Sequence, residues 1–189
     1  ILYRSSAVVY INRILLGFIF QSLPYCMSRS YYETERLILK PTEISDDDVI
    51  LGVLNSPKFL EFVGDRNVRT LNDARQYIVG KIRPQIDKLG YGSFTLIRKE
   101  DQLKIGVCGL YDRPGVNGID LGFGLLPQFE GLGFGSEAAA RVLKLAFNDF
   151  GLREVKAITS KQNSGSQKVL EKMGFERDGY ITLPDAEEV

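Results

Sequence analysis

The segment Gln128–Gly135 reads QFEGLGFG and separates a strand-like run from a long helix-like run. Glycines at 131, 133 and 135 alternate with other residues, so the main chain there can curl and approach an anion without Cβ clashes. The helix that follows begins with unpaired N–H groups and a partial positive charge, and both attract phosphate. A glycine-rich turn that binds nothing is the competing interpretation. The alternating glycines alone do not separate the two.

Two better-known phosphate loops do not fit this segment. A P-loop carries a lysine after its last glycine, whereas Ser136 and Glu137 stand there. A dinucleotide-binding unit needs an acidic residue near the end of the next strand to bond the ribose, and Ala157–Ser160 contains none. The segment also follows strands that are joined by short turns, which is typical of antiparallel hairpins. The sequence therefore argues against both a P-loop and a dinucleotide-binding unit.

The surrounding pattern predicts one α+β domain. Ser45 precedes three aspartates, and Thr70 precedes Asp73 by three positions, and both arrangements are typical of helix starts. Pro84 falls inside the second of these helices and predicts a kink or a break there. Expected strands span 35–41, 93–99, 103–111, 118–126 and 153–160, and expected helices begin near 45, 57, 71, 136 and 164. Short turns between the middle strands favour a mixed, mostly antiparallel sheet flanked by helices.

The composition excludes several classes of function. Lysine plus arginine equals aspartate plus glutamate at 24 each, so no basic excess indicates a nucleic-acid partner. The chain has no histidine, which removes the commonest general base, the serine–histidine triads and most zinc sites, and no metal site is expected. Two cysteines cannot form a disulfide framework, and Cys108 in an apolar strand is expected to be a buried structural thiol.

Residues 1–26 differ from the rest of the chain. They are apolar, carry Arg4 and Arg13, and contain no acidic residue, so a targeting sequence and a membrane-associated segment are both conceivable. Asn12 and Arg13 interrupt the segment, so stable membrane insertion is not expected. We therefore interpret residues 1–26 as a leader or a non-native N-terminal extension, and residues 27–189, which start at Met27, as the domain.

The motifs together resemble the GNAT superfamily of acetyl-CoA-dependent acetyltransferases over about residues 33–181. Gln128, Gly131 and Gly133 match the pyrophosphate motif of the family in order, and TERLILKP at 34–41 is similar to the opening of the branch that acetylates N-termini of ribosomal proteins. The run GSEAAARVLKLAF resembles the central helix of that branch. Asn163, Ser166 and the run EKMGFE resemble its second coenzyme-binding motif.

This resemblance implies a GNAT-like fold, in which strand 118–126 splays from strand 153–160 and opens a V in the sheet. It implies acetyl-CoA as co-substrate, with the pantetheine arm along the main chain of the splayed strand and the pyrophosphate on N–H groups of the glycine loop. The family usually adds a last strand that pairs back into the sheet, and this chain stops at Val189. The coenzyme-binding residues are expected to be Leu125, Leu126, Gln128, Gly131, Leu132, Gly133, Phe134, Gly135, Ser136, Asn163 and Ser166.

The resemblance further implies a cytoplasmic enzyme, a monomer or a homodimer, that acetylates a primary amine at a protein N-terminus or on a small molecule. The amine must be neutral when it attacks the thioester. Without histidine the base must be a carboxylate, acting through water, and Asp120 and Asp112 are the candidates. An ordinary charge at a strand edge explains each of them equally well. The N–H near Leu126 is the expected oxyanion donor.

Two observations leave alternatives open. Leu170 stands where many family members carry a tyrosine acid, and a simple helix cap is the other interpretation of Asn163. A module of the same fold that binds acyl-CoA as a sensor, without catalysis, is therefore one alternative. A nucleotide-binding protein of another class is the second, and titration with acetyl-CoA and with NAD distinguishes it.

Overall fold

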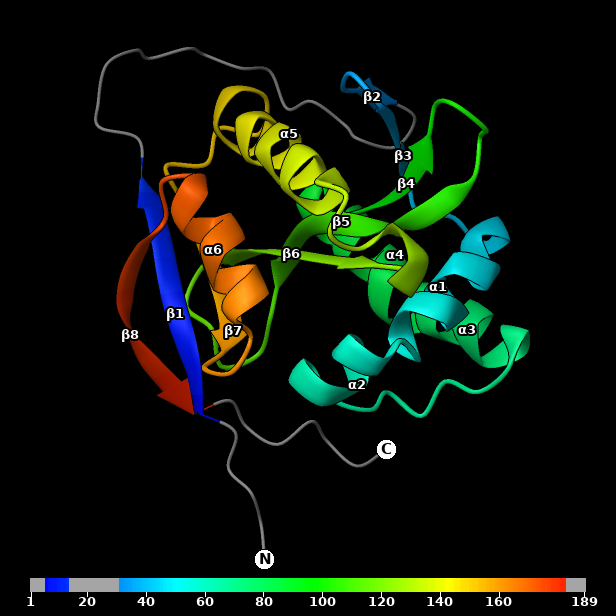
Figure 1. Ribbon diagram of the computed structural model, residues 1–189, viewed down its shortest axis with the longest axis horizontal. Coiled ribbons are helices and arrows are strands. Elements are labelled where there is room, and N and C mark those ends of the chain that lie inside the picture. Colours follow the sequence, from blue (N-terminus) through cyan, green and yellow to red (C-terminus); the bar gives the residue numbers. More distant parts are fainter. Residues whose placement is uncertain (1–5, 14–30, 183–189) are drawn as a thin grey trace, which may run out of the picture.

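The computed structural model describes residues 6–13 and 31–182, in which one eight-stranded sheet has the order β2-β3-β4-β5-β6-β7-β1-β8 (Figure 1). The strands are β1 Ser6–Arg13, β2 Tyr32–Glu33, β3 Leu37–Pro41, β4 Ser93–Arg98, β5 Lys104–Asp112, β6 Ile119–Leu125, β7 Glu154–Ser160 and β8 Glu176–Thr182. The helical elements are η2 Ile44–Asp46, α1 Asp47–Leu54, α2 Pro57–Phe62, α3 Leu71–Tyr77, η3 Ile78–Ile82, α4 Arg83–Leu89, η4 Pro127–Phe129, α5 Phe134–Asn148 and α6 Ser164–Lys172.

The sheet is mixed and mostly antiparallel, as expected. Each neighbouring pair from β2 to β6 is antiparallel, whereas β6 and β7 run parallel and share one paired position, Asp120 opposite Lys156. This position lies near the start of both strands. Beyond it the two strands diverge toward their carboxyl ends, which produces the V in the sheet (Figure 1).

Helices cover both faces of the sheet around this V. A Cβ atom added at Gly135 of α5 would contact the side chains of Phe123 and Leu125, whereas one added at Gly124 would meet Val53 of α1 and Phe59 of α2. Because successive residues of a strand point to opposite faces, α5 packs on one face of β6, and α1 and α2 pack on the other. Helix α6 lies beside α5 on the first face (Figure 1).

Strand β1 corrects our interpretation of residues 1–26. Residues 6–13 do not lie outside the domain: β1 pairs antiparallel with β7 along one edge and with β8 along the other. Its side chains enter the core, where Val8 and Tyr10 are buried, and Asn12 donates to the carbonyl oxygen of Met173 at the end of α6, at 3.1 Å. The strand that closes the sheet between β7 and β8 thus comes from the N-terminal side. The rest of residues 1–26 lies outside the described part of the chain.

The helix boundaries follow the local sequence. Thr70 and Asp73 form the expected capping box at the start of α3, and Ser56 caps α2 with Pro57 in its first turn. The expected break at Pro84 is a wide π-turn, η3, immediately before it. Proline lacks an N–H and crowds the preceding turn, so a locally widened turn accommodates Pro84 while the helix continues.

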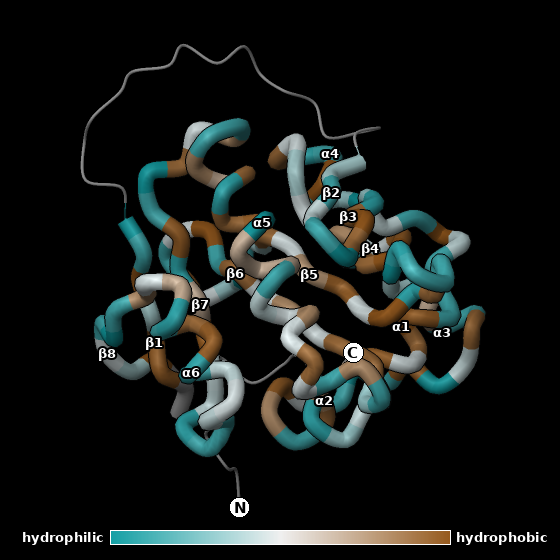
Figure 2. Tube along the Cα trace, turned by 45° about the horizontal axis from the view of Figure 1, so that its top comes forward, coloured by the Kyte–Doolittle hydropathy of each residue, from teal (hydrophilic) through white to brown (hydrophobic). Residues whose placement is uncertain are grey.

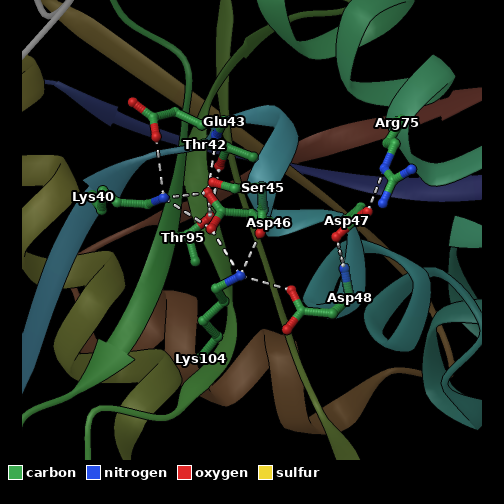
Figure 3. A network of polar contacts seen from close by, with 10 residues as sticks. All are labelled: Lys40, Thr42, Glu43, Ser45, Asp46, Asp47, Asp48, Arg75, Thr95 and Lys104. Carbon is green, nitrogen blue, oxygen red and sulfur yellow. Dashed lines mark hydrogen bonds and ion pairs between the residues drawn. The ribbon is translucent and has the colours of Figure 1, made fainter. Parts of the chain in front are cut away.

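A buried polar network fixes α1 against the sheet (Figure 3). The Asp46 carboxylate, at the start of α1, is fully buried and lies 2.8 Å from Lys40 Nζ of β3 and 3.2 Å from Lys104 Nζ of β5. It also accepts hydrogen bonds from Thr95 Oγ1 and from the N–H of Glu43. Because hydrogen bonds and two ammonium groups satisfy the carboxylate, its charge can be buried at low cost, and it joins α1 to strands β3, β4 and β5.

The core lies between the sheet and the two helical layers. Figure 2 shows hydrophobic colour along the middle strands and hydrophilic colour over the outer turns and connections. Cys108 is fully buried in this core, as expected for a structural thiol, and burial raises its pKa. Within 6–13 and 31–182, none of the helices combines the length and the apolar character that a membrane span requires.

Candidate active site

The three glycines of the loop serve different purposes. Gly131 and Gly133 have φ of +74° and +84°, in the left-handed region that favours glycine. A Cβ at Gly131 would meet open space, whereas one at Gly133 would lie 3.3 Å from a guanidinium nitrogen of Arg36. Gly135 is different, because it lies inside α5, where a Cβ would make only ordinary contacts with Phe123 and Leu125 of β6. Gly131 and Gly133 therefore shape the loop, whereas the fold does not require glycine at position 135.

The loop delivers main-chain donors at the start of α5. Gly133 is the N-cap, and the first helical hydrogen bond runs from the N–H of Glu137 to the carbonyl of Gly133 at 3.1 Å. The N–H groups of Phe134, Gly135 and Ser136 precede that bond, and the first-turn donors of a helix have no partner within the helix. Together with the helix dipole they form an anion-binding end, located where β6 terminates.

The hydrogen-bond pattern of β6 corrects part of the expected coenzyme contacts. The N–H of Leu126 donates to Ile105 O at 2.9 Å, and the carbonyl of Leu126 accepts from the N–H of Phe129 at 2.9 Å. Both main-chain groups of Leu126 are therefore engaged, so this N–H is not free to bind an oxyanion or a pantetheine arm. Main-chain groups alternate in direction along an antiparallel strand, so those of Leu125 and Phe123 point away from β5, into the V.

The second expected coenzyme motif lies at the same edge of the sheet. Since β6 and β7 are parallel, α5 and α6 both begin at the carboxyl ends of these strands, on either side of the V. Asn163 caps α6, because its side-chain oxygen accepts the N–H of Ser166 at 3.0 Å. The cap is thus real, and a ligand role for Asn163 and Ser166 stays a prediction. Between α5 and α6 lies a hollow of about 400 Å³, which Ser136, Ala140 and Lys172 help to line.

Asp120, at the closed end of the V, forms a buried ion pair. Arg113 Nε donates to both of its carboxylate oxygens, at 2.8 and 2.9 Å, and the Asp120 side chain is 2% exposed. Burial raises the pKa of Asp120, although the charge and hydrogen bonds of Arg113 oppose the shift. The carboxylate lies on the α1 side of β6, with Tyr111 directly opposite in β5.

The second expected base, Asp112, is placed differently. Its carboxylate lies 2.8 Å from Lys88 Nζ of α4, and its N–H donates to Gln85. Asp112 is close enough to Asp120 for its charge to contribute to the raised pKa of that residue. Leu170, at the position where the resemblance implies a tyrosine, is buried in the core and offers no proton donor.

Three residues at the site were missed by the sequence reasoning. Arg113 stands in the β5–β6 turn. The hairpin register pairs Tyr111 with Asp120 and so brings this turn close to the carboxylate, and that register was the signal that could have identified Arg113. Arg36 and Glu137 join the loop to β3 across 101 positions of the chain. No local sequence pattern predicts a contact between residues so far apart in the chain.

The comparisons with known proteins agree with this geometry. Residues 36–176 match the model of the acetyltransferase (GNAT) domain. An uncharacterised N-acetyltransferase, p20, of Bacillus licheniformis is 27% identical over 150 residues, which cover 78% of this chain and 83% of that protein. A kanamycin resistance protein of Rhizobium radiobacter is 36% identical over 72 residues, 38% of this chain and 66% of its own length.

Solved structures share the fold. An acetyltransferase from Agrobacterium tumefaciens superposes with a TM-score of 0.69 at 24% identity, over 93% of this chain and 94% of that one. The ribosomal-protein-S5-alanine acetyltransferase of Vibrio fischeri gives a TM-score of 0.67 at 20% identity, over 79% and 85% of the two chains. The family match extends over most of the chain and includes both the loop and the V. The chain therefore belongs to the GNAT acetyltransferase family.

Proposed function

We propose that this acetyltransferase moves an acetyl group from acetyl-CoA to a primary amine by direct attack of the amine on the thioester. The observation that carries the proposal is the juxtaposition of two features at one edge of the sheet. An anion-binding helix start, shaped by left-handed Gly131 and Gly133, stands beside a V whose wall presents main-chain groups of Phe123 and Leu125. A pyrophosphate joined to an extended amide-bearing arm suits both features at once.

The residues available to the coenzyme follow from this arrangement. The N–H groups of Phe134, Gly135 and Ser136 would bind the pyrophosphate, and the main chain of Leu125 and Phe123 would bind the arm in place of a neighbouring strand. Gln128 and Leu132 are exposed on the loop, and the hollow beside α5 is lined by both Lys172 and the acidic Glu137.

Asp120 is the better candidate for the base. It lies in the wall of the V, about five residues or roughly 17 Å along β6 from Leu125, so an arm that enters at the loop carries the thioester toward it. Its raised pKa suits proton abstraction from an ammonium group better than that of an ordinary aspartate. Each oxygen keeps a second lone pair beside the Arg113 bond, which a water molecule between base and amine can use. With Leu126 engaged, the N–H of Leu125 or Phe123 takes over the oxyanion role.

The acceptor is an amine, and an activity assay with several amines is needed to identify it. Relatives that match 38% of this chain include aminoglycoside N(6')-acetyltransferases of Klebsiella pneumoniae and Serratia marcescens, and solved structures of the same fold include ribosomal-protein acetyltransferases. A panel should therefore contain peptides with free N-termini, a polyamine and kanamycin. We expect the protein to act in the cytoplasm, as a monomer or a homodimer.

The deciding experiment measures release of coenzyme A thiol from acetyl-CoA with each amine, alongside thermal unfolding with coenzyme A and with NAD. We expect turnover with at least one amine, and stabilisation by coenzyme A but not by NAD. A ligand at 100 times its Kd adds about 2.7 kcal/mol to the unfolding free energy. Stabilisation by coenzyme A without turnover on any amine would favour the sensor module. Stabilisation by NAD alone would contradict the proposal.

A further inference from the structure

We propose that Arg36 is a positioning residue that holds the glycine loop in the conformation that binds the pyrophosphate, an inference that rests on the proposed function. Arg36 lies in the turn between β2 and β3, far from the loop in sequence. Its guanidinium nevertheless reaches across the start of α5, where it contacts Leu132 and Phe134 of the loop and Glu137 of the helix.

The contacts of Arg36 form a clamp. Nη1 donates to the carbonyl of Leu132 at 3.0 Å, and Nε donates to Glu137 Oε2 at 2.7 Å. The guanidinium plane lies over the ring of Phe134, 4.3 Å from its centroid. Thr34 Oγ1 and the N–H of Arg36 both donate to Glu137 Oε1, at 2.5 and 2.9 Å, so the whole turn is docked on α5.

The bond to Leu132 sets the direction of a donor. In a trans peptide the carbonyl and the N–H point in opposite directions. Because the Leu132 carbonyl faces Arg36, the N–H of Gly133 faces away from Arg36. Arg36 thus prevents this peptide from turning over and keeps the Gly133 donor available at the helix start. A left-handed glycine on either side of Leu132 makes such a turnover easy without the clamp.

The bond to Glu137 removes a repulsion. Glu137 is in the first turn of α5, where its negative charge stabilises the helix but opposes a bound phosphate. Burial alone would raise the pKa of Glu137, but the hydrogen bonds from Thr34 and from the main chain and side chain of Arg36 outweigh it, so the pKa is lowered and the group is ionised at neutral pH. Arg36 supplies the cation that neutralises it beside the anion site.

The test compares Arg36→Gln and Arg36→Lys with the unaltered chain by calorimetric titration with coenzyme A. Both should bind about tenfold more weakly or worse, a change of about 1.4 kcal/mol, since lysine keeps the charge but lacks the planar guanidinium whose separate nitrogens reach Glu137 and Leu132. Binding of pantetheine, followed by ligand-observed NMR, should be unchanged, because pantetheine has no pyrophosphate. Circular dichroism verifies folding of each variant.

Arg141→Gln is the matched control. Arg141 of α5 donates to the carbonyl of Glu33 at 3.2 Å and lies over the ring of Tyr32, so it joins the same β2 region to the same helix, away from the loop. It should bind coenzyme A normally. Unaltered affinity in either Arg36 variant, or an equal loss in Arg141→Gln, would overturn the inference. Failure of the unaltered chain to bind coenzyme A would instead refute the proposed function.

Discussion

Arg113, in the turn between β5 and β6, donates from one nitrogen, Nε, to both carboxylate oxygens of Asp120 near the start of β6. The acid is almost completely buried, whereas the arginine side chain is 37% exposed. The pair therefore keeps an ionisable group inside the V while one end of its partner reaches solvent.

Replacing Arg113 with methionine should move the acid limb of the pH–rate profile to higher pH. Burial already raises the pKa of Asp120, and Arg113 opposes that shift, so its loss raises the pKa further and the base is deprotonated only at higher pH. The unfolding free energy should fall by about 2–3 kcal/mol, less than for a fully buried pair because Arg113 is partly exposed. An acid limb that stays in place would exclude Asp120 as the base. Asp120→Asn, which cannot accept a proton, should abolish the limb and most of the activity.

Gly133→Val should weaken coenzyme A binding far more than Gly131→Ala. Both positions have positive φ, but alanine at 131 meets open space and adds only the cost of the left-handed conformation, about 1–2 kcal/mol. Valine at 133 adds β-branching and crowds the Arg36 guanidinium, which a Cβ at this position already approaches to 3.3 Å. Calorimetry with coenzyme A measures both. Gly179→Ala in β8, which also meets open space without positive φ, should bind normally. Equal affinity of the 133 and 131 variants would contradict our assignment of the loop.

Asp46→Asn should lower the unfolding free energy by about 3 kcal/mol at neutral pH, because Lys40 and Lys104 would lose their shared buried counter-ion and keep only the more exposed Glu43 and Asp48. Burial raises the pKa of Asp46, but hydrogen bonds from Lys40 and Glu43 and the charge of Lys40 lower it overall. The carboxylate therefore stabilises the fold above its unfolded pKa of about 3.9, and this stabilisation is lost as the pH falls through the lower folded value.

Urea unfolding of the Asp46→Asn variant at pH 7 and at pH 3 measures this effect. The difference between variant and unaltered protein should shrink at the lower pH. Asp65→Asn, which breaks an exposed pair with Arg69, should change stability little at either pH. A constant difference at both pH values would show that Asp46 does not act through its charge.

Tyr10→Ala in β1 should cost about 3–5 kcal/mol of stability, as for other large aromatic truncations in a core. Tyr10→Phe should cost only about 1 kcal/mol, because it loses just the hydroxyl that bonds Glu171 at 3.3 Å. Chemical denaturation ranks the two, and hydrogen exchange should show weaker protection in β7 and β8. Equal stability of Tyr10→Ala and the unaltered chain would mean that β1 contributes nothing to the sheet in solution.

Elements whose signals are local were predicted well. The capping box at Thr70, the helix at 164 and the strand at 153–160 lie within two residues of their expected bounds, because caps, glycines and hydrophobic period are read from neighbouring residues. The glycine loop and its position before α5 were also predicted from neighbouring residues. The engaged state of Leu126 did not, since it depends on the register between β5 and β6 rather than on residue type.

Strand β1 was misjudged for a related reason. Its run AVVYI is rich in β-branched and aromatic residues, which favours a strand, but its partners lie near the other end of the chain. Lack of acidic residues in the same segment suggested a leader instead. Pairing at this range leaves no trace in any local window.

The position of β1 has a consequence for synthesis of the protein. Arg13 and its partner Glu154 are 141 positions apart, so β1 leaves the ribosome long before either of its neighbours. At about 5–20 residues per second, its apolar side chains wait about 7–28 s for β7, and longer for β8. During translation this half of the sheet therefore cannot form before β7 and β8 are synthesised. Until α6 and β8 emerge, the nascent chain carries an unpaired strand that chaperones can recognise.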